Sequence, residues 1–137
     1  MTPTPRAAAV ALDGRNLLVL EYGGALALYD SGTGSLRKTF ETRGESKLVQ
    51  NLGVQGKVAI YTTGTGFGLG DFSHSTLHAV NLTTGKDRVI GRFGTSFADA
   101  IGLARIDNTG VVYSTSRVED NGRLVFLPWS RVAAAVG

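Results

Sequence analysis

A short apolar run that ends in a polar turn occupies the middle of the chain, as Leu77-His78-Ala79-Val80-Asn81-Leu82-Thr83-Thr84-Gly85. The same arrangement occurs earlier, as Leu26-Ala27-Leu28-Tyr29-Asp30-Ser31-Gly32-Thr33-Gly34. A copy that lacks the Thr-Gly turn occurs near the end, as Leu124-Val125-Phe126-Leu127-Pro128-Trp129. Because a strand followed by a tight turn recurs three times, the sequence predicts a fold built from one repeated unit.

The spacing of the copies indicates the size of this unit. Asp30 and Asn81 are 51 residues apart, and Leu77 and Leu124 are 47 residues apart. A period of roughly 40 to 50 residues is typical of propeller blades, each of which is one small sheet. We therefore expect a single all-β domain over residues 1–137, made of three four-stranded antiparallel blades at about 7–42, 46–94 and 98–137, which is a half or partial β-propeller.

Glycine usage supports a chain of many short strands. The 19 glycines among 137 residues are about twice the ordinary share, and there are only three prolines. Pairs such as Asp13-Gly14 are hairpin signals, because glycine accepts a positive φ without steric cost. Asp13, Asp30 and Asp107 fit turn positions, where a carboxylate accepts hydrogen bonds from nearby backbone N–H groups.

Composition excludes several classes of function. The chain has no cysteine, which removes disulfides, thiolate metal sites and a cysteine nucleophile. The net charge of +3 comes without a cluster of basic residues, so we expect no nucleic-acid partner. No apolar run approaches the roughly 18 residues of a membrane helix, and no signal peptide is seen, so we expect no membrane partner. The compartment stays open, with the cytoplasm expected if the chain is complete.

The alanine-rich segments 6–12 and 130–136 allow two interpretations. Alanine is the best helix former, and Ser130 could cap a helix at its N-terminus. Segments this short make marginal helices on their own. We therefore predict strands in both segments.

The pattern of an apolar strand, Asp or Asn, two residues and Thr-Gly occurs in residues 29–34 and 80–85. It resembles the β-propeller repeats of quinoproteins and of TolB-like and YVTN-like proteins, and the resemblance covers nearly the whole chain. It departs from WD40-like repeats, because no Gly-His pair opens a unit and no Trp-Asp pair closes one. The resemblance implies a fold family rather than an activity.

Three blades are too few to close a propeller ring, which typically has four to eight. The outer faces of the first and last blades would both be bare, and exposed apolar patches promote association. We therefore expect a homodimer that completes a six-bladed ring, or association with missing blades that lie elsewhere. The chain is then a non-catalytic binding or scaffold module, with a protein or small-molecule ligand over the central channel.

Ligands of propellers generally sit at the ends of the innermost strands, which is an argument from analogy alone. The polar residues expected near those ends are Lys47, Asn51, Asp99 and Arg105. Solvated loops and channel-lining groups are the simpler interpretation of the same residues.

Asp71, His74 and His78 are the candidate ligands for a divalent metal, with surface histidines as the simpler interpretation. His74 and His78 have an even separation, which places them on one face of a strand. The glycines of segment 64–70 alternate with other residues, which does not fit a phosphate-binding loop. No Gly-x-Ser-x-Gly motif is present, and we identify no catalytic residues and expect no cofactor besides this possible metal.

Two alternatives to a binding module stay open. The first is a metal-dependent propeller enzyme of the lactonase or quinoprotein kind, which requires several acidic, Asn or His side chains at one end of the inner strands. The second is a sugar-binding propeller, which requires an aromatic residue repeated in each blade.

Overall fold

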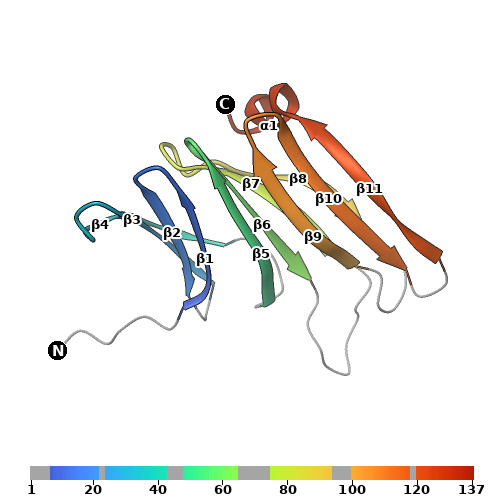
Figure 1. Ribbon diagram of the computed structural model, residues 1–137, viewed down its shortest axis with the longest axis horizontal. Helices are drawn as coiled ribbons and strands as arrows, with labels where there is room; N and C mark the ends of the chain where they lie inside the picture. The colour runs from blue at the N-terminus through green and yellow to red at the C-terminus, as the bar shows by residue number, and fades with distance from the viewer. Residues whose placement is uncertain (1–6, 22–23, 43–47, 65–74, 94–99, 118–119) are drawn as a thin grey trace.

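The computed structural model describes residues 7–21, 24–42, 48–64, 75–93, 100–117 and 120–137, and these form three antiparallel sheets followed by one helix (Figure 1). Each strand pairs with its neighbour in the sequence. Sheet 1 consists of β1 (Ala7–Asp13), β2 (Asn16–Glu21), β3 (Ala25–Asp30) and β4 (Leu36–Glu41). Sheet 2 consists of β5 (Leu48–Gln55), β6 (Val58–Gly64), β7 (Ser75–Asn81) and β8 (Asp87–Phe93). Sheet 3 consists of β9 (Ala100–Asp107), β10 (Gly110–Arg117) and β11 (Asp120–Pro128).

The repeated turn of the sequence joins the third and fourth strands of sheets 1 and 2. Asp30 Oδ1 accepts hydrogen bonds from the N–H groups of Gly32 and Thr33, at 2.8 and 3.1 Å. Asn81 Oδ1 accepts the equivalent bonds from Thr83 and Thr84, at 2.9 and 3.1 Å. Gly34 and Gly85 then take positive φ angles of 73° and 79°. The Asp/Asn-x-x-Thr-Gly pattern is therefore a turn held by its own first side chain.

The three sheets pack face to face, with their first strands β1, β5 and β9 side by side (Figure 1). Sheet 2 is buried on both faces, so two separate cores form. The core between sheets 1 and 2 contains Leu18, Leu20, Leu26, Leu28, Phe40, Val54, Ala59, Tyr61, Val80 and Leu82. The core between sheets 2 and 3 contains Val58, Ile60, Leu77, Ala79, Ile101, Ala104, Val111, Tyr113, Leu127, Val132 and Val136.

The end of the chain departs from the prediction. Sheet 3 has three strands, and the segment predicted as its fourth strand is instead the helix α1 (Trp129–Val136). Its N-cap is Pro128 rather than Ser130. The helix forms because Val132 and Val136, four residues apart on one helical face, are both buried, while the alanines between them favour helix.

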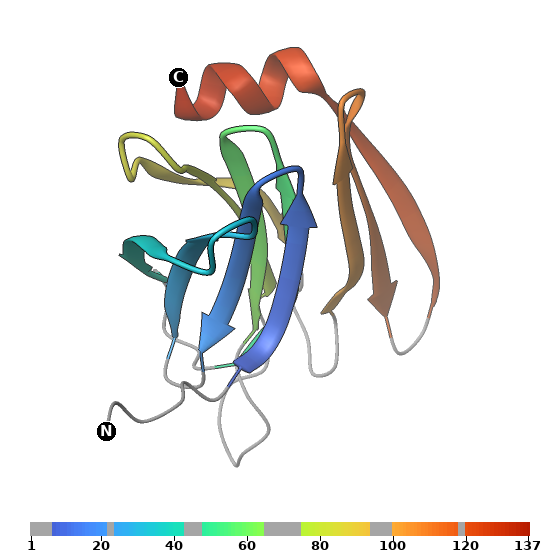
Figure 2. The same cartoon turned by 60° about the vertical axis from the view of Figure 1, so that its left-hand side comes forward.

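The helix lies across the hairpin ends of sheets 2 and 3 (Figure 2). Asn81 Nδ2 donates to Val136 O at 2.9 Å, and Lys86 Nζ donates to Gly137 O at 3.0 Å. These two bonds satisfy carbonyls at the helix C-terminus that lack an intrahelical partner. Among the described residues, no helix is long and apolar enough to cross a membrane.

Candidate functional site

Each sheet has two faces, which we name by direction along the chain. The forward face points toward the next sheet, and the backward face points toward the preceding sheet. Inside the protein, the forward face of sheet 1 packs on the backward face of sheet 2, and the forward face of sheet 2 packs on the backward face of sheet 3. Among the described residues, no sheet lies against the backward face of sheet 1 or the forward face of sheet 3, and we call these the two end faces.

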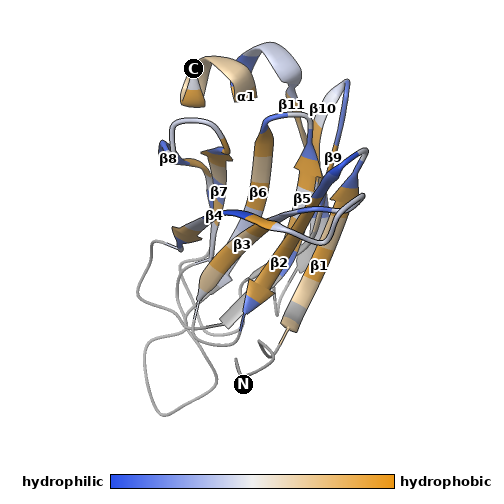
Figure 3. Ribbon diagram, turned by 90° about the vertical axis from the view of Figure 1, so that its left-hand side faces the viewer, coloured by the Kyte–Doolittle hydropathy of each residue, from blue (hydrophilic) through white to orange (hydrophobic). Residues whose placement is uncertain are grey.

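The backward face of sheet 1 is apolar, and part of it is exposed, although Val19 and Ala27 on the same face are buried. Val10, Leu12 and Leu36 are 63%, 64% and 56% exposed. Viewed from this end of the molecule, hydrophobic residues run along β1, β2 and β3 (Figure 3). A cavity of about 300 Å³ opens here, lined by Ala7, Val10, Leu17, Val19, Tyr29, Asp30, Ser31 and Gly34. This end face is therefore a hollowed apolar surface.

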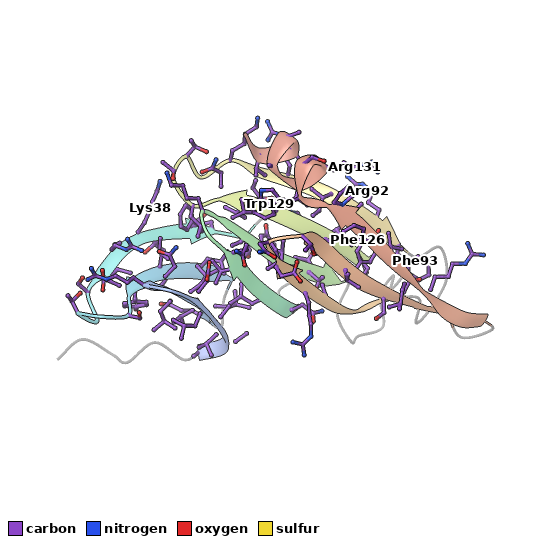
Figure 4. All side chains as sticks on the ribbon, turned by 45° about the horizontal axis from the view of Figure 1, so that its top comes forward. Lys38, Arg92, Phe93, Phe126, Trp129 and Arg131 are labelled. Atoms are coloured by element: carbon purple, nitrogen blue, oxygen red, sulfur yellow. The ribbon has the colours of Figure 1, made fainter. Side chains whose placement is uncertain are left out.

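The forward face of sheet 3 is also apolar and exposed. Leu124 and Phe126 on β11 are 79% and 54% exposed, and Val112 on β10 is 42% exposed. Phe126 lies on β11, away from Trp129 at the start of α1 (Figure 4). Of the large hydrophobic side chains that are exposed in the described part of the chain, all but Val89 belong to the two end faces. Exposed apolar surface is thus concentrated where the stack of sheets stops.

A buried polar network lies on the backward face of sheet 2, under sheet 1. Tyr61 and His78 are cross-strand partners whose rings stack, with centroids 4.6 Å apart and planes 9° apart. His78 Nδ1 lies 2.8 Å from Asp87 Oδ1, and the Tyr61 hydroxyl donates to Asp87 Oδ2. All three side chains are buried, so the carboxylate has two partners in place of water.

The network continues from His78 toward the far end of sheet 2. Thr76 Oγ1 lies 3.0 Å from His78 Nε2, and Thr63 Oγ1 lies 2.5 Å from Thr76 Oγ1. If His78 donates from Nδ1 to Asp87, its Nε2 accepts the Thr76 hydroxyl, and Thr76 accepts the Thr63 hydroxyl. This hydroxyl–imidazole–carboxylate order is that of a general-base relay. Both ring nitrogens and both carboxylate oxygens have protein partners under sheet 1, and the network therefore ties β6, β7 and β8 together.

Sequence reasoning did not find this network. Tyr61 and Asp87 are 26 residues apart, and only the strand register brings them to His78. The available signal was a histidine inside an apolar strand, which needs a polar partner once it is buried.

Of the four residues predicted near a channel, two lie in the described part of the chain. Asn51 on β5 donates through N and Nδ2 to Thr62 Oγ1, at 3.1 and 2.9 Å, and its Oδ1 accepts the N–H of Ala104 at 3.4 Å. Arg105, which follows Ala104 on β9, is exposed. Asn51 therefore links sheets 2 and 3, and the side chains of Lys47 and Asp99 lie outside the described residues. Ligand binding at these positions stays a prediction.

Of the predicted metal ligands, only His78 is described, because Asp71 and His74 lie outside the described residues. Both nitrogens of His78 already contact Thr76 and Asp87. Within the described ranges, no group of three or more metal-ligating side chains is present. The metal site stays a prediction.

Two turn carboxylates have lowered pKa values. Partial burial raises the pKa of Asp30, but hydrogen bonds from Arg15, Thr33 and Gly32 outweigh it and hold the pKa below the usual value. The hydroxyl and N–H of Thr109 donate to Asp107 Oδ1 at 2.5 and 2.7 Å, and these bonds lower the pKa of Asp107. Asp13 differs from both, since its Oδ2 accepts the N–H of Gly56 in sheet 2, at 2.5 Å. The prediction of a local turn bond is therefore confirmed for Asp30 and Asp107, whereas Asp13 links two sheets.

No family model matches the chain, and no curated protein matches it significantly. Among solved structures, the chain is similar to the crystal structure of the computationally designed Ika4 protein, with a TM-score of 0.47 and 12% sequence identity. The likeness covers 92% of this chain and 94% of that chain. At this TM-score and identity it supports no statement on function.

Proposed function

We propose that the chain is a non-catalytic scaffold or binding module made of propeller blades, which associates through its two end faces with a second copy and completes a ring of six. The observation that supports this most is the concentration of exposed large apolar side chains on those faces, which hold all of them in the described part of the chain except Val89. Val10, Leu12 and Leu36 belong to one end, and Val112, Leu124 and Phe126 belong to the other. Apolar patches of this kind on a soluble protein mark surfaces that other protein covers.

The expected energies favour association. Full burial of a Leu, Val or Phe side chain contributes about 1.5–3 kcal/mol, and these residues are already partly covered, so each adds less than that. Loss of translational and rotational freedom costs about 4–15 kcal/mol. A ring closed by two copies makes the end contact twice. The six exposed side chains of each copy are then all buried, while the cost of lost translational and rotational freedom arises only once.

A double variant, Leu12→Asp with Leu124→Asp, tests this function, because it places one carboxylate on each end face without altering a buried residue. In sedimentation velocity, we expect the wild-type protein to sediment as a species of twice the chain mass, and the double variant to sediment as a monomer. Thr83→Asp, in an exposed turn of sheet 2, is the matched control and keeps the wild-type mass. Equal masses for wild type and double variant would contradict the proposal.

The two alternative functions have less support. A metal-dependent enzyme needs a cluster of ligating side chains, and the described residues contain none of three or more. A sugar-binding propeller needs a repeated aromatic residue. Tyr61 and Tyr113 do occupy one register, but both are buried between sheets. We therefore propose no catalytic or sugar-binding role.

A further inference from the structure

The pairing of second and third strands gives every sheet the same register. We number the pairs between the second and third strands of each sheet from the end next to the hairpin that joins the first and second strands. The first pair is then Asn16–Asp30 in sheet 1, Val58–Asn81 in sheet 2 and Gly110–Pro128 in sheet 3. Odd pairs lie on the forward face, and even pairs lie on the backward face. Residues of different sheets can therefore be compared position by position.

The forward pairs show what sheet 3 lacks. The third pair is Leu18–Leu28 in sheet 1 and Ile60–Ala79 in sheet 2, and all four residues are buried against the next sheet. In sheet 3, the same pair is Val112–Phe126, and it is exposed. The fifth pair repeats this contrast, since Leu124 holds the register of Leu26 and Leu77.

The backward pairs show the reverse at sheet 1. The second pair is Ala59–Val80 in sheet 2 and Val111–Leu127 in sheet 3, and both are buried against the preceding sheet. In sheet 1, the same pair is Leu17–Tyr29, which lines the cavity of about 300 Å³ and is only half-buried. Each end face thus carries apolar residues at the registers that form an interface twice inside the chain.

We infer that the forward face of sheet 3 packs on the backward face of sheet 1 of a second copy, so that the contact between copies repeats the contact between consecutive sheets. This inference rests on the proposed self-association and specifies its geometry. Phe126 and Leu124 of one copy enter the hollow lined by Val10, Leu17 and Tyr29 of the other. The contact is head to tail, and two copies make it twice.

The hairpin ends are complementary in the same direction. Between sheets 1 and 2, the carboxylate of Asp13 at the end of β1 accepts the N–H of Gly56. Asp107 is the last residue of β9, and Asp13 is the last residue of β1, so the two occupy equivalent positions. Likewise, Gly14 and Gly56 are equivalent, because each directly follows the first strand of its sheet. The head-to-tail contact brings Asp107 toward Gly14 of the second copy. Arg15, next to Gly14, pairs with Asp30 at 3.0 Å but keeps a side chain that is 70% exposed, so a positive charge faces the solvent where Asp107 would arrive.

A back-to-back dimer does not use this complementarity. If sheet 3 met sheet 3, Phe126 and Leu124 would contact their own copies, and the hollow of sheet 1 would stay open. If sheet 1 met sheet 1, two hollows would face each other, and the side chains that project from sheet 3 would stay exposed. Only the head-to-tail contact covers both end faces of both copies.

Two single variants distinguish these arrangements. Val10→Asp blocks the end face of sheet 1, and Phe126→Asp blocks that of sheet 3. Both residues are more than half exposed, so we expect each variant to fold, as circular dichroism will check. In a head-to-tail ring, each variant alone loses both contacts, and its dissociation constant rises by about 30-fold or more. Mixing the two restores one contact, between the intact sheet 3 of Val10→Asp and the intact sheet 1 of Phe126→Asp.

The expected result is two variants that are monomeric alone and that recover dimer mass when mixed, measured by light scattering at one total concentration. Leu12→Asp and Leu124→Asp provide a second, independent pair. A dimer of Val10→Asp alone would indicate sheet 3 against sheet 3, and a dimer of Phe126→Asp alone would indicate sheet 1 against sheet 1. Either result, or a mixture that dimerises no more than each variant alone, would overturn the head-to-tail contact and with it the ring of six, while leaving self-association itself intact. A monomeric wild type would overturn the proposed function itself.

Discussion

Leu26 and Leu124 occupy the same position in sheets 1 and 3, five cross-strand pairs from the hairpin turn, but Leu26 is fully buried and Leu124 is 79% exposed. The two residues have the same chemistry and the same strand register. The difference is the next sheet, which covers Leu26, whereas no sheet formed by the described residues covers Leu124. The comparison indicates that sheet 3 carries the residues of an internal sheet at the end of the stack, and four predictions compare the parts of the stack.

The largest change in stability is expected at the polar network between sheets 1 and 2, because the described residues form no equivalent network between sheets 2 and 3. At the register of Tyr61–His78, sheet 3 has Tyr113–Val125 and sheet 1 has Val19–Ala27. His78→Val copies the residue of sheet 3, but it leaves the buried Asp87 carboxylate with the Tyr61 hydroxyl alone. We expect a loss of about 3–5 kcal/mol in the free energy of unfolding, measured by urea denaturation.

The matched control for His78→Val removes the buried carboxylate and both of its side-chain partners, as Tyr61→Phe, His78→Val and Asp87→Leu together. Replacement of a buried polar group by apolar residues of similar size is often neutral, so the triple variant recovers most of the lost stability. A triple variant less stable than His78→Val would show that the side chains do more than satisfy one another.

The second prediction compares the two leucines directly. Leu26→Ala leaves a cavity between sheets 1 and 2, and we expect it to lower the free energy of unfolding by about 2–5 kcal/mol. Leu124→Ala removes an exposed side chain, and we expect it to change monomer stability by less than about 0.5 kcal/mol while weakening the dimer. Denaturation at low concentration and light scattering at high concentration separate these effects. Equal losses of monomer stability would contradict the assigned burial.

The third prediction concerns α1, the helix that follows sheet 3 in the chain. Asn81→Asp keeps the oxygen that accepts the turn bonds from Thr83 and Thr84, but it removes the Nδ2 donor to Val136 O. The new negative charge also lies at the helix C-terminus, where it is unfavourable. We expect a loss of about 1 kcal/mol, measured by urea denaturation. Asn81→Ala also loses the turn bonds, so we expect it to lower the free energy of unfolding by more than Asn81→Asp does. A smaller loss for Asn81→Ala would contradict a stabilising role of the turn bonds.

The smallest effect is the pH dependence at Asp107, whose pKa is lowered from the ordinary 3.8 by bonds from Thr109. A carboxyl whose pKa is lowered by folding stabilises the protein at pH values above the pKa that it has in the unfolded chain. This contribution is lost as the pH falls through the pKa of the folded state. We expect wild-type stability to decline more steeply below pH 3.8 than that of Asp107→Asn. Identical slopes in denaturation curves over this range would contradict the assignment.

The repeat of strand and turn could be predicted because it depends on local chemistry. Asp30 and Asn81 each form their turn bonds within three residues, so the pattern is visible in the sequence. The all-β class and the two four-stranded sheets followed from that pattern. The C-terminal helix did not, because Val132 and Val136 are buried against strands that are distant in the sequence.

The polar contacts between strands and between sheets could not be predicted for the same reason. Asn51 was predicted near the end of an inner strand, and its amide also bonds to Thr62 and to Ala104, which is 53 residues further along the chain. His78 was named with Asp71 and His74 as a candidate metal ligand, an assignment that stays a prediction, and its contact with Asp87 on the neighbouring strand was not foreseen. Residues that meet across strands show no common spacing in the sequence, because loop lengths vary from sheet to sheet.

The central claim is that the end faces of sheets 1 and 3 are covered by a second copy. The absolute mass of the wild-type protein, measured by light scattering over a range of concentrations, tests it most directly. We predict a mass of twice the 14.4 kDa of one chain, falling toward 14.4 kDa only on dilution. A mass of one chain at every concentration would contradict the claim, because Val10, Leu12, Leu124 and Phe126 would then stay exposed in solution.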